Sequence, residues 1–405
     1  MKNNSNKKSL IKKIRSEYIV KQILEHLNRI RLMAISQYNK KYQKMFDIQK
    51  EEYKKESYRI EIEIIPVVDG KGKFINIRKG NEAHFKIYFN YNRQEVNKTK
   101  ILKKDKVGKI KVVIDYKNNA FYGLFSECKC IKKIKFLKFN RPDIVNMNLM
   151  FYGCSELEEL DLSKFRTDKV IKMFKMFSYC TSLKKLDLSK FKTIKVKEMN
   201  NMFAGCSALE EINLTSFNTF NVEDMGSMFS SCSSLKKLDL SNFNTKSVKN
   251  MSNMFYQCSS LKELNVSNFN TENVINMSMM FGKCSSLKEL NLSSFNTINV
   301  EDMRSMFYGA SSLINLDLSN FNTDNVKSMY YIFEGCSSMV KLNIANFNIN
   351  SEKINIQSMF SGCDSLKEII TSETFKKQFG DFFPLILNKN NLFLIYNKKL
   401  FNHII

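Results

Sequence analysis

Histidine is scarce in this chain, which has only His26, His84 and His403 among its 405 residues. The three lie far apart in the sequence, and none belongs to a recognisable motif. The chain also lacks a P-loop, a G-x-G-x-x-G, a G-x-S-x-G and any paired metal ligands. Catalysis needs a convergent set of titratable groups, which nothing in the sequence supports. We therefore expect a protein that is not an enzyme and that uses no cofactor, metal or small-molecule substrate.

Long hydrophobic runs are also missing. The amino terminus opens with Lys and Asn and never reaches the unbroken apolar run of roughly 7–15 residues that a secretory signal needs. The apolar stretches 382–387 and 392–396 fall short of the ~20 residues that span a bilayer. These absences predict an intracellular, cytoplasmic protein with reduced cysteines, and a cell-surface location stays open as the alternative.

Acidic residues are too few to balance the basic ones, and the formal net charge is +24. Residues 1–57 carry 15 Lys and Arg against 6 Asp and Glu, and residues 58–124 carry 15 against 7. Residues 125–366 are nearly balanced, with 28 against 24. The basic residues 1–124 therefore predict nucleic acid or an anionic membrane as alternative partners.

A 26-residue repeat fills most of the remaining chain. Its phenylalanines stand at 125, 151, 177, 203, 229, 255, 281, 307 and 333, with one more at 360 after a single-residue insertion. The unit is L-x-x-L-x-L-S-x-F-x-T-x-x-V-x-x-M-x-x-M-F-x-x-C-S-S. A period of 20 to 50 residues is typical of a solenoid, in which each coil buries its apolar face only against its neighbours.

Two periodicities divide the unit. Leu264 and Val266 alternate with polar residues, as in a strand with one buried side. From Val274 onward, apolar residues recur at i, i+3, i+6 and i+7, which places them on one helical face. The pattern predicts an α/β repeat solenoid whose coils each hold one short strand and one short helix, with a parallel sheet and with the helices on the outer side.

The LxLSxFxT, VxxMxxMF and CSSL segments resemble the BspA-type leucine-rich-repeat family over residues 125 to about 370. That resemblance implies a leucine-rich-repeat fold and a role in interaction, because members are mostly surface or adhesion proteins of bacteria and expanded sets in protists. The chain departs from them in lacking a recognisable signal peptide, lipid-attachment cysteine or membrane anchor.

Four regions follow from these patterns. We expect a basic amphipathic helical segment at 1–57, a β-rich N-terminal cap at 58–124, the solenoid at 125–370 and a C-terminal cap at 371–405. Four apolar segments within residues 58–118 alternate with turn residues and predict the strands of the first cap. Caps are expected because an open end would expose a sheet edge and apolar side chains.

The repeated cysteines and methionines are interpreted as core. Each cysteine of the main column stands three residues after the repeat Phe, and Ala310 replaces it in one coil. The position therefore requires only a small, buried, weakly polar side chain. The row Glu159, Lys185, Glu211, Lys237 and Glu263 alternates in charge and is expected to guide the stacking of the coils.

Two sets of residues are candidate protein-binding residues. Asp161, Asp187, Asp239 and Asp317 project from the strands onto the inner face of the sheet, which is polar and lacks Trp, Tyr and Arg anchors. Tyr152, Tyr179, Tyr256 and Tyr308 lie just past the repeat Phe, on the variable loop edge. A plain solvated ladder is the alternative for the Asp set.

The repeat array favours a non-catalytic protein-binding scaffold or adaptor. A surface adhesion protein of the BspA type is the alternative that the resemblance implies. Binding of nucleic acid or an anionic membrane through residues 1–124 is the alternative that the charge implies. The partner, the binding face of the solenoid and the oligomeric state do not follow from the sequence.

Overall fold

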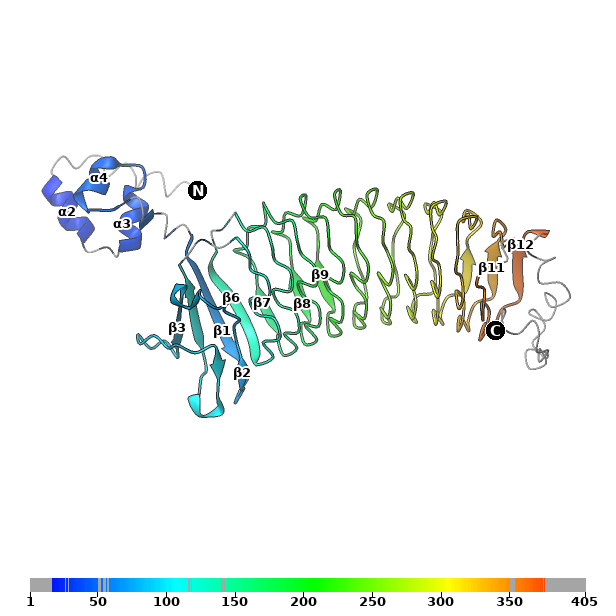
Figure 1. Cartoon of the computed structure of the whole chain (residues 1–405), viewed down its shortest axis with the longest axis horizontal. Helices are drawn as coiled ribbons and strands as arrows, with labels where there is room; N and C mark the ends of the chain where they lie inside the picture. The colour runs from blue at the N-terminus through cyan, green and yellow to red at the C-terminus, as the bar shows by residue number, and fades with distance from the viewer. Residues whose placement is uncertain are drawn as a thin grey trace.

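The computed structural model describes residues 17–25, 27, 29–49, 52–53, 56, 58–115, 117, 119–139, 141, 143–349, 354–373 and 375. Its described part is a long array of coils with a small β-rich cap at the amino-terminal end and three short helices beyond the cap (Figure 1). No helix within those ranges is long and apolar enough to cross a membrane.

The described residues before the cap include three helices, α2 (Glu17–Glu25), α3 (Arg29–Ser36) and α4 (Lys40–Met45). Asn39 caps α4, because its side-chain oxygen accepts the N–H groups of Lys41 and Tyr42. A small apolar cluster that is separate from the main core holds this unit together. Its buried members are Leu24, Leu32, Met33, Phe46 and Ile48.

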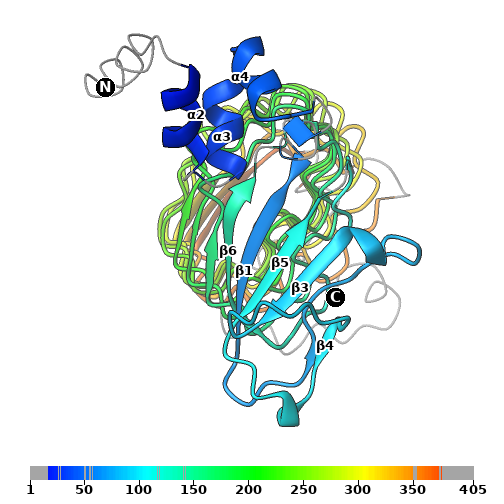
Figure 2. The same ribbon diagram turned by 90° about the vertical axis from the view of Figure 1, so that its left-hand side faces the viewer.

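The described residues of the cap form five strands: β1 (Ile60–Pro66), β2 (Gly72–Lys73), β3 (Phe85–Phe89), β4 (Lys100–Ile101) and β5 (Ile110–Ile114). β1 alternates fully buried isoleucines with the half-buried Glu61 and Glu63, as its period-2 sequence requires. It pairs antiparallel with β5 on one side and with β6 (Ile131–Phe139), the strand of the first coil, on the other. The cap therefore continues the solenoid sheet in the order β3-β5-β1-β6-β7 (Figure 2).

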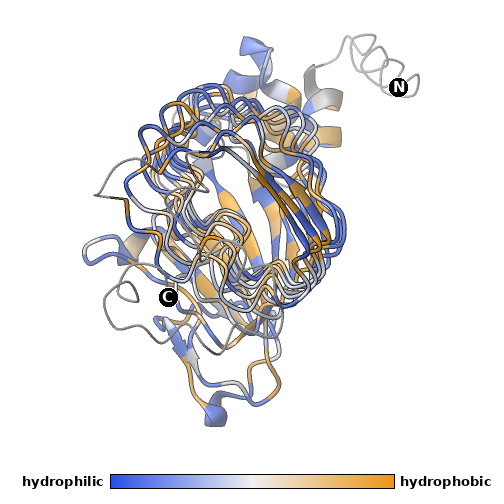
Figure 3. Ribbon diagram, turned by 90° about the vertical axis from the view of Figure 1, so that its right-hand side faces the viewer, coloured by the Kyte–Doolittle hydropathy of each residue, from blue (hydrophilic) through white to orange (hydrophobic). Residues whose placement is uncertain are grey.

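The later coils contribute short strands to the same side of the array: β7 (Glu159–Asp161), β8 (Lys185–Asp187), β9 (Glu211–Asn213), β10 (Asn315–Asp317), β11 (Lys341–Ile344) and β12 (Glu368–Thr371). Parallel, in-register pairing joins β6 to β7, β8 to β9, β10 to β11 and β11 to β12, with partners 26 residues apart between β8 and β9. Viewed from the carboxy-terminal end, the coils overlie one another and the cap strands lie behind them (Figure 3). Of the predicted C-terminal cap, only 371–373 and 375 belong to the described residues.

Stacked phenylalanines fill the interior. The rings of the repeat Phe lie 5.4–6.0 Å apart, nearly parallel, from Phe125 to Phe360. The repeat methionines from Met147 to Met329 are completely buried beside them. The 26-residue period thus places identical side chains in contact, which confirms the solenoid and the core interpretation of the methionines.

The helix predicted for each coil is wrong. Within the described residues from 119 onward through the coils, the M-x-x-M-F segment forms a run of turns. N–H groups of residues 150, 152 and 154 donate to carbonyls three residues earlier, at 3.1–3.3 Å. Those of residues 147, 149, 151 and 153 donate instead to carbonyls of the next coil, at 2.8–3.0 Å. An α-helix would need these donors within the segment, and the left-handed Leu149 (φ 58°) would interrupt it.

Buried threonines connect successive coils on another side. The Thr245 hydroxyl donates to the Asn270 carbonyl and accepts the Asn270 N–H, both at 2.8 Å. The equivalent threonines 167, 193, 219, 271, 297 and 323 make the same two hydrogen bonds. Each coil therefore satisfies backbone groups of its neighbour where no strand pairing is available.

Candidate binding surfaces

The aspartates of the strand face all take part in a local turn. In each of Asp161, Asp187, Asp239 and Asp317, the carboxylate accepts the N–H of the serine two residues later, at 2.9–3.0 Å. Asparagine does the same in other coils, for example Asn265 with Ser267 at 3.0 Å. The Ser241 backbone and side chain hold the pKa of Asp239 below its usual value. Both Asp and Asn can accept this local hydrogen bond in the turn, which explains why they exchange at this position.

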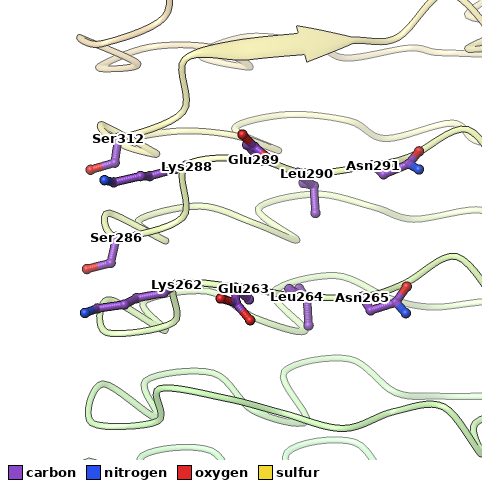
Figure 4. A pocket seen from close by; sticks show the side chains of 10 residues that line it. All are labelled: Lys262, Glu263, Leu264, Asn265, Ser286, Lys288, Glu289, Leu290, Asn291 and Ser312. Carbon is purple, nitrogen blue, oxygen red and sulfur yellow. The ribbon is translucent and has the colours of Figure 1, made fainter.

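A shallow hollow opens on this face where the strand pairing is interrupted. No strand is assigned between residues 214 and 314 of the described chain. The hollow has a volume of about 730 Å³, and Figure 4 shows two identical Lys-Glu-Leu-Asn tetrads, 262–265 and 288–291, along its wall. Polar side chains and the edges of two leucines form this wall, and it holds no aromatic or arginine anchor.

The predicted charge row forms ion pairs only between strands that pair. Lys185 and Glu211 form an ion pair at 2.8 Å, and Lys133 extends the row to Glu159 at 2.6 Å. Among the described residues, no ion pair joins Glu159 to Lys185, or Lys237 to Glu211 or Glu263. Each gap in the row thus lies where neighbouring coils do not pair as strands.

The candidate tyrosines form two clusters on the turn edge. Tyr152 and Tyr179, in adjoining coils, meet edge to face with ring centroids 5.8 Å apart. Farther along, the Lys283 ammonium lies 5.9 Å from the ring centre of Tyr256 and 5.6 Å from that of Tyr308. One cation is thus placed between aromatic rings of the preceding and following coils. Tyr179 is 52% exposed, and the other three rings are half-buried.

Sequence reasoning missed Lys283, although a signal was present. Lys283 occupies the position two residues after the repeat Phe, where Tyr179 also stands and where Gly153, Gly205 and Gly309 stand in other coils. All five residues have positive φ. An added Cβ at Gly205 would lie 2.7 Å from the Tyr179 ring, so the glycine leaves room for this tyrosine. The residue two positions after the repeat Phe, glycine or larger, therefore determines the local shape of the turn edge.

A further exposed edge was not predicted from the sequence. Phe220 is 52% exposed and lines a hollow with Lys197, Glu223 and Lys249. Glu223 pairs with Lys249 at 3.2 Å and with Lys197 at 3.7 Å. The neighbouring Ile194 is 41% exposed. The edge combines apolar surface with ion pairs that are largely solvated and so contribute little to stability.

The cysteine column is structural. Each thiol from Cys154 to Cys284 donates to the carbonyl of the repeat Phe in the preceding coil, at 3.0–3.2 Å. Burial raises the pKa of Cys206 and of Cys284 to about 12. Neutral, enclosed thiols are poor nucleophiles and poor metal ligands, which agrees with the core interpretation.

The coils, their parallel strands and the repeated leucines define a leucine-rich-repeat solenoid, as the BspA-type resemblance implies. The profile of the family described as "Mycoplasma protein of unknown function, DUF285" matches residues 119–238, 185–289, 223–341 and 258–373, which together cover more than half of the chain. The chain belongs to this family.

Solved structures show weaker similarity, and no curated protein matches the chain. A leucine-rich repeat protein from Bacteroides ovatus is 18% identical, over 71% of this chain and 76% of that one, with a TM-score of 0.38. The TLR13 chain of a TLR13–ssRNA13 complex is 17% identical, over 54% of this chain and 40% of that one, with a TM-score of 0.21.

Proposed function

We propose that this protein is a non-catalytic scaffold that binds a protein partner through the tyrosine edge of its solenoid. The observation that supports this best is the Tyr256–Lys283–Tyr308 cluster, which presents aromatic rings and a cation on adjoining coils. Tyrosine is among the residues that concentrate binding energy in protein interfaces. Asp161, Asp187, Asp239 and Asp317 are secondary candidates, because their carboxylates already accept local hydrogen bonds.

The repeat itself supplies conservative test variants. Serine stands at the position of Tyr256 and Tyr308 in other coils, as Ser178 and Ser230, and Ser231 stands at the position of Tyr179. The variants Tyr179→Ser, Tyr256→Ser and Tyr308→Ser should therefore fold normally. In cross-linking and mass spectrometry from cells of the source organism, we expect the triple variant to lose partners that the wild type recovers. Tyr38→Ser, at an 89% exposed tyrosine in the helical unit, is the control. Identical partner sets for the triple variant and the wild type would contradict the proposal.

The scaffold is proposed to act as an intracellular adaptor, with a BspA-type surface adhesin as the alternative. The two differ in location and not in fold. Antibody labelling of intact and permeabilised cells separates them, because an adaptor is labelled only after permeabilisation. Labelling of intact cells would favour the adhesin.

A second candidate function is binding of a polyanion, either nucleic acid or an anionic membrane, through residues 1–124. It is supported by the net charges of +9 on residues 1–57 and +8 on residues 58–124, which follow from the counts given above. Such binding should weaken steeply as salt is added, because counterions are released on association. Binding that is absent or insensitive to salt would exclude it.

A further inference from the structure

A projecting tip of the cap combines exposed aliphatic side chains with lysines. β2 and β4 pair at its base, with Gly72 opposite Ile101, so the turn before β2 and the 3-10 turn η2 (Lys103–Asp105) after β4 lie at the same end. Figure 2 shows this part of the cap, around β4, extending beyond the outline of the coils. Val68 in the first turn is 91% exposed, and Leu102 beside η2 is 50% exposed.

The backbone of the tip does not depend on these two aliphatic side chains. In the first turn, the Gly70 N–H donates to the Val67 carbonyl at 2.9 Å, and Val68 is a corner residue whose side chain faces solvent. In the second, the Asp105 carboxylate accepts the Leu102 N–H at 2.9 Å and the Lys98 ammonium at 2.8 Å. Turn corners usually carry Gly, Pro, Asn, Asp or Ser, so exposed Val and Leu at both turns have no local structural reason.

Lysines surround the two aliphatic residues. Five exposed ones lie on the tip: Lys71, Lys100, Lys103, Lys104 and Lys106. In the part of the chain that the structure describes, none of these five forms an ion pair. Asp105 is occupied by Lys98, so Asp69 is the remaining acidic group of the two turns. The tip therefore presents concentrated positive charge around apolar side chains.

The tip rests on a rigid base. Phe74 is completely buried and Ile101 is 2% exposed, and both belong to the main core. The Cys130 thiol of the first coil donates to the Lys73 carbonyl at 3.2 Å. A side chain at the tip is therefore held at a fixed place relative to the solenoid.

We propose that this tip binds an anionic lipid membrane. Val68 and Leu102 enter the boundary between headgroups and acyl chains, and the lysines bind the lipid phosphates. Apolar insertion together with electrostatic attraction is the combination by which proteins bind membrane surfaces reversibly. A single-stranded nucleic acid would favour aromatic rings for stacking, which the two turns lack. The proposal deepens the second candidate function and rests on it.

Matched charge reversals test the role of the lysines. The full chain is mixed with vesicles of phosphatidylcholine, with or without phosphatidylserine, and binding is measured by co-sedimentation. The variant Lys103→Glu/Lys104→Glu is compared with Lys236→Glu/Lys237→Glu, an exposed lysine pair on the solenoid that gives the same change in net charge. We expect binding to serine-containing vesicles to weaken at least about tenfold in the tip variant and to stay near wild type in the solenoid variant.

Aliphatic variants test insertion independently of charge. Val68→Ser/Leu102→Ser should weaken vesicle binding by about tenfold, because both side chains lose their apolar contact with the membrane. Ile298→Ser, at a 40% exposed isoleucine of the solenoid, should bind as the wild type does. Thermal unfolding followed by circular dichroism verifies that all variants fold.

The outcomes distinguish membrane binding by the tip from binding by the overall positive charge of residues 1–124. If both tip variants bind vesicles as tightly as the wild type, the tip proposal is overturned while the second candidate function stands. If the wild type binds no anionic vesicle, the tip proposal and the membrane form of the second candidate function are both wrong. Binding of a single-stranded RNA oligonucleotide without vesicle binding would likewise overturn the tip proposal in favour of a nucleic-acid partner.

Discussion

Each thiol of the cysteine column is both a core side chain and a hydrogen-bond donor. The acceptor, the carbonyl of a repeat Phe, also receives a backbone N–H within its own coil, as Phe281 does from Cys284 at 3.2 Å. Ala310 removes the thiol in one coil, and the Phe281 carbonyl keeps this second donor. A single Cys→Ala change should therefore cost about 1–3 kcal/mol, for the lost hydrogen bond and the small cavity, without leaving the carbonyl unpaired.

The raised thiol pKa values predict that the protein loses stability in alkali. An unfolded thiol ionises near pH 9.0, whereas Cys206 and Cys284 stay protonated up to about pH 12 in the folded chain. Between these values the folded state binds more protons, so stability is complete below pH 9 and falls as pH rises. Over this pH range, each such thiol lowers the free energy of unfolding by about 1.4 kcal/mol per pH unit.

Urea unfolding at several pH values above neutrality measures this slope. The variant Cys206→Ala/Cys284→Ala should lose stability less steeply with pH than the wild type, even if it is less stable at neutral pH. Equal slopes would show that ionisation of these thiols does not control alkaline unfolding.

Two substitutions at Thr245, one of the buried threonines, distinguish the contribution of side-chain shape to stability from that of hydrogen bonding. Thr245→Val keeps the volume of the buried side chain and removes both hydrogen bonds to Asn270, so we expect a loss of about 1–3 kcal/mol in unfolding free energy. Thr245→Ser keeps the hydroxyl and should cost about 1 kcal/mol for the lost methyl group. Chemical denaturation compares the two, and a more stable Val variant would contradict the assigned role.

At the scale of the element, the turn run explains why one sequence prediction failed. Apolar residues at i, i+3 and i+6 fit a helix, but successive turns that advance by three residues give the same spacing. The distinguishing signal was glycine at one repeat position, present at 153, 205, 309, 335 and 362, where every φ is positive. The buried positions followed from alternation in these coils, as with Leu264 and Val266, but the predicted strands are present only outside residues 214–314 of the described chain.

At this repeat position, two residues after the repeat Phe, we expect a substitution to glycine to increase stability. Gln257 stands there with φ 59°, a conformation that costs a side-chain-bearing residue about 1 kcal/mol. Gln257→Gly relieves this conformation but removes the hydrogen bond that the Gln257 side chain accepts from the Ser231 hydroxyl at 2.9 Å, so the net gain in stability should be up to about 0.5 kcal/mol. Gln257→Val loses the same hydrogen bond and keeps the strain, so it should lower stability by about 1 kcal/mol or more. The control Lys237→Gly lies outside the positive-φ positions and should be destabilising. Thermal unfolding midpoints distinguish these signs.

The candidate surfaces were predictable only in part. The tyrosines could be placed on the turn edge because their distance from the repeat Phe is fixed. The placement of Lys283 between two tyrosines depends on side chains from three coils, which the repeat consensus does not contain. The hollow at 262–312 depends on where strands cease to pair, although its Lys-Glu-Leu-Asn tetrads match those expected of a paired strand.

At the scale of the whole molecule, charge changes sign along the array. Residues 125–200 carry 17 Lys and Arg against 9 Asp and Glu, and residues 201–366 carry 11 against 15. The first coils therefore extend the basic character of the cap, and the later coils are slightly acidic. An anionic surface would attract the cap end and leave the later coils, with Tyr256 and Tyr308, accessible to the protein partner proposed above.

Because the two apolar cores are separate, we expect a destabilising substitution in one core to leave the structure around the other unaffected. Ile62 belongs to the core that runs from the cap through the coils, and its strand β1 pairs with β6. Leu32 belongs to the small core of the helices.

Ile62→Asp buries an unpaired charge, so amide exchange in β6 and β7 should accelerate by about 100-fold or more. The effect should fade toward β12, because coils contact only their neighbours. Leu32→Asp should accelerate exchange only within residues 17–49. Hydrogen exchange with mass spectrometry measures both in the full chain. Protection of β6 that survives Ile62→Asp would mean that the cap does not close the solenoid as the sheet pairing indicates. Loss of β6 protection in Leu32→Asp would mean that the core of the helices is not independent of the main core.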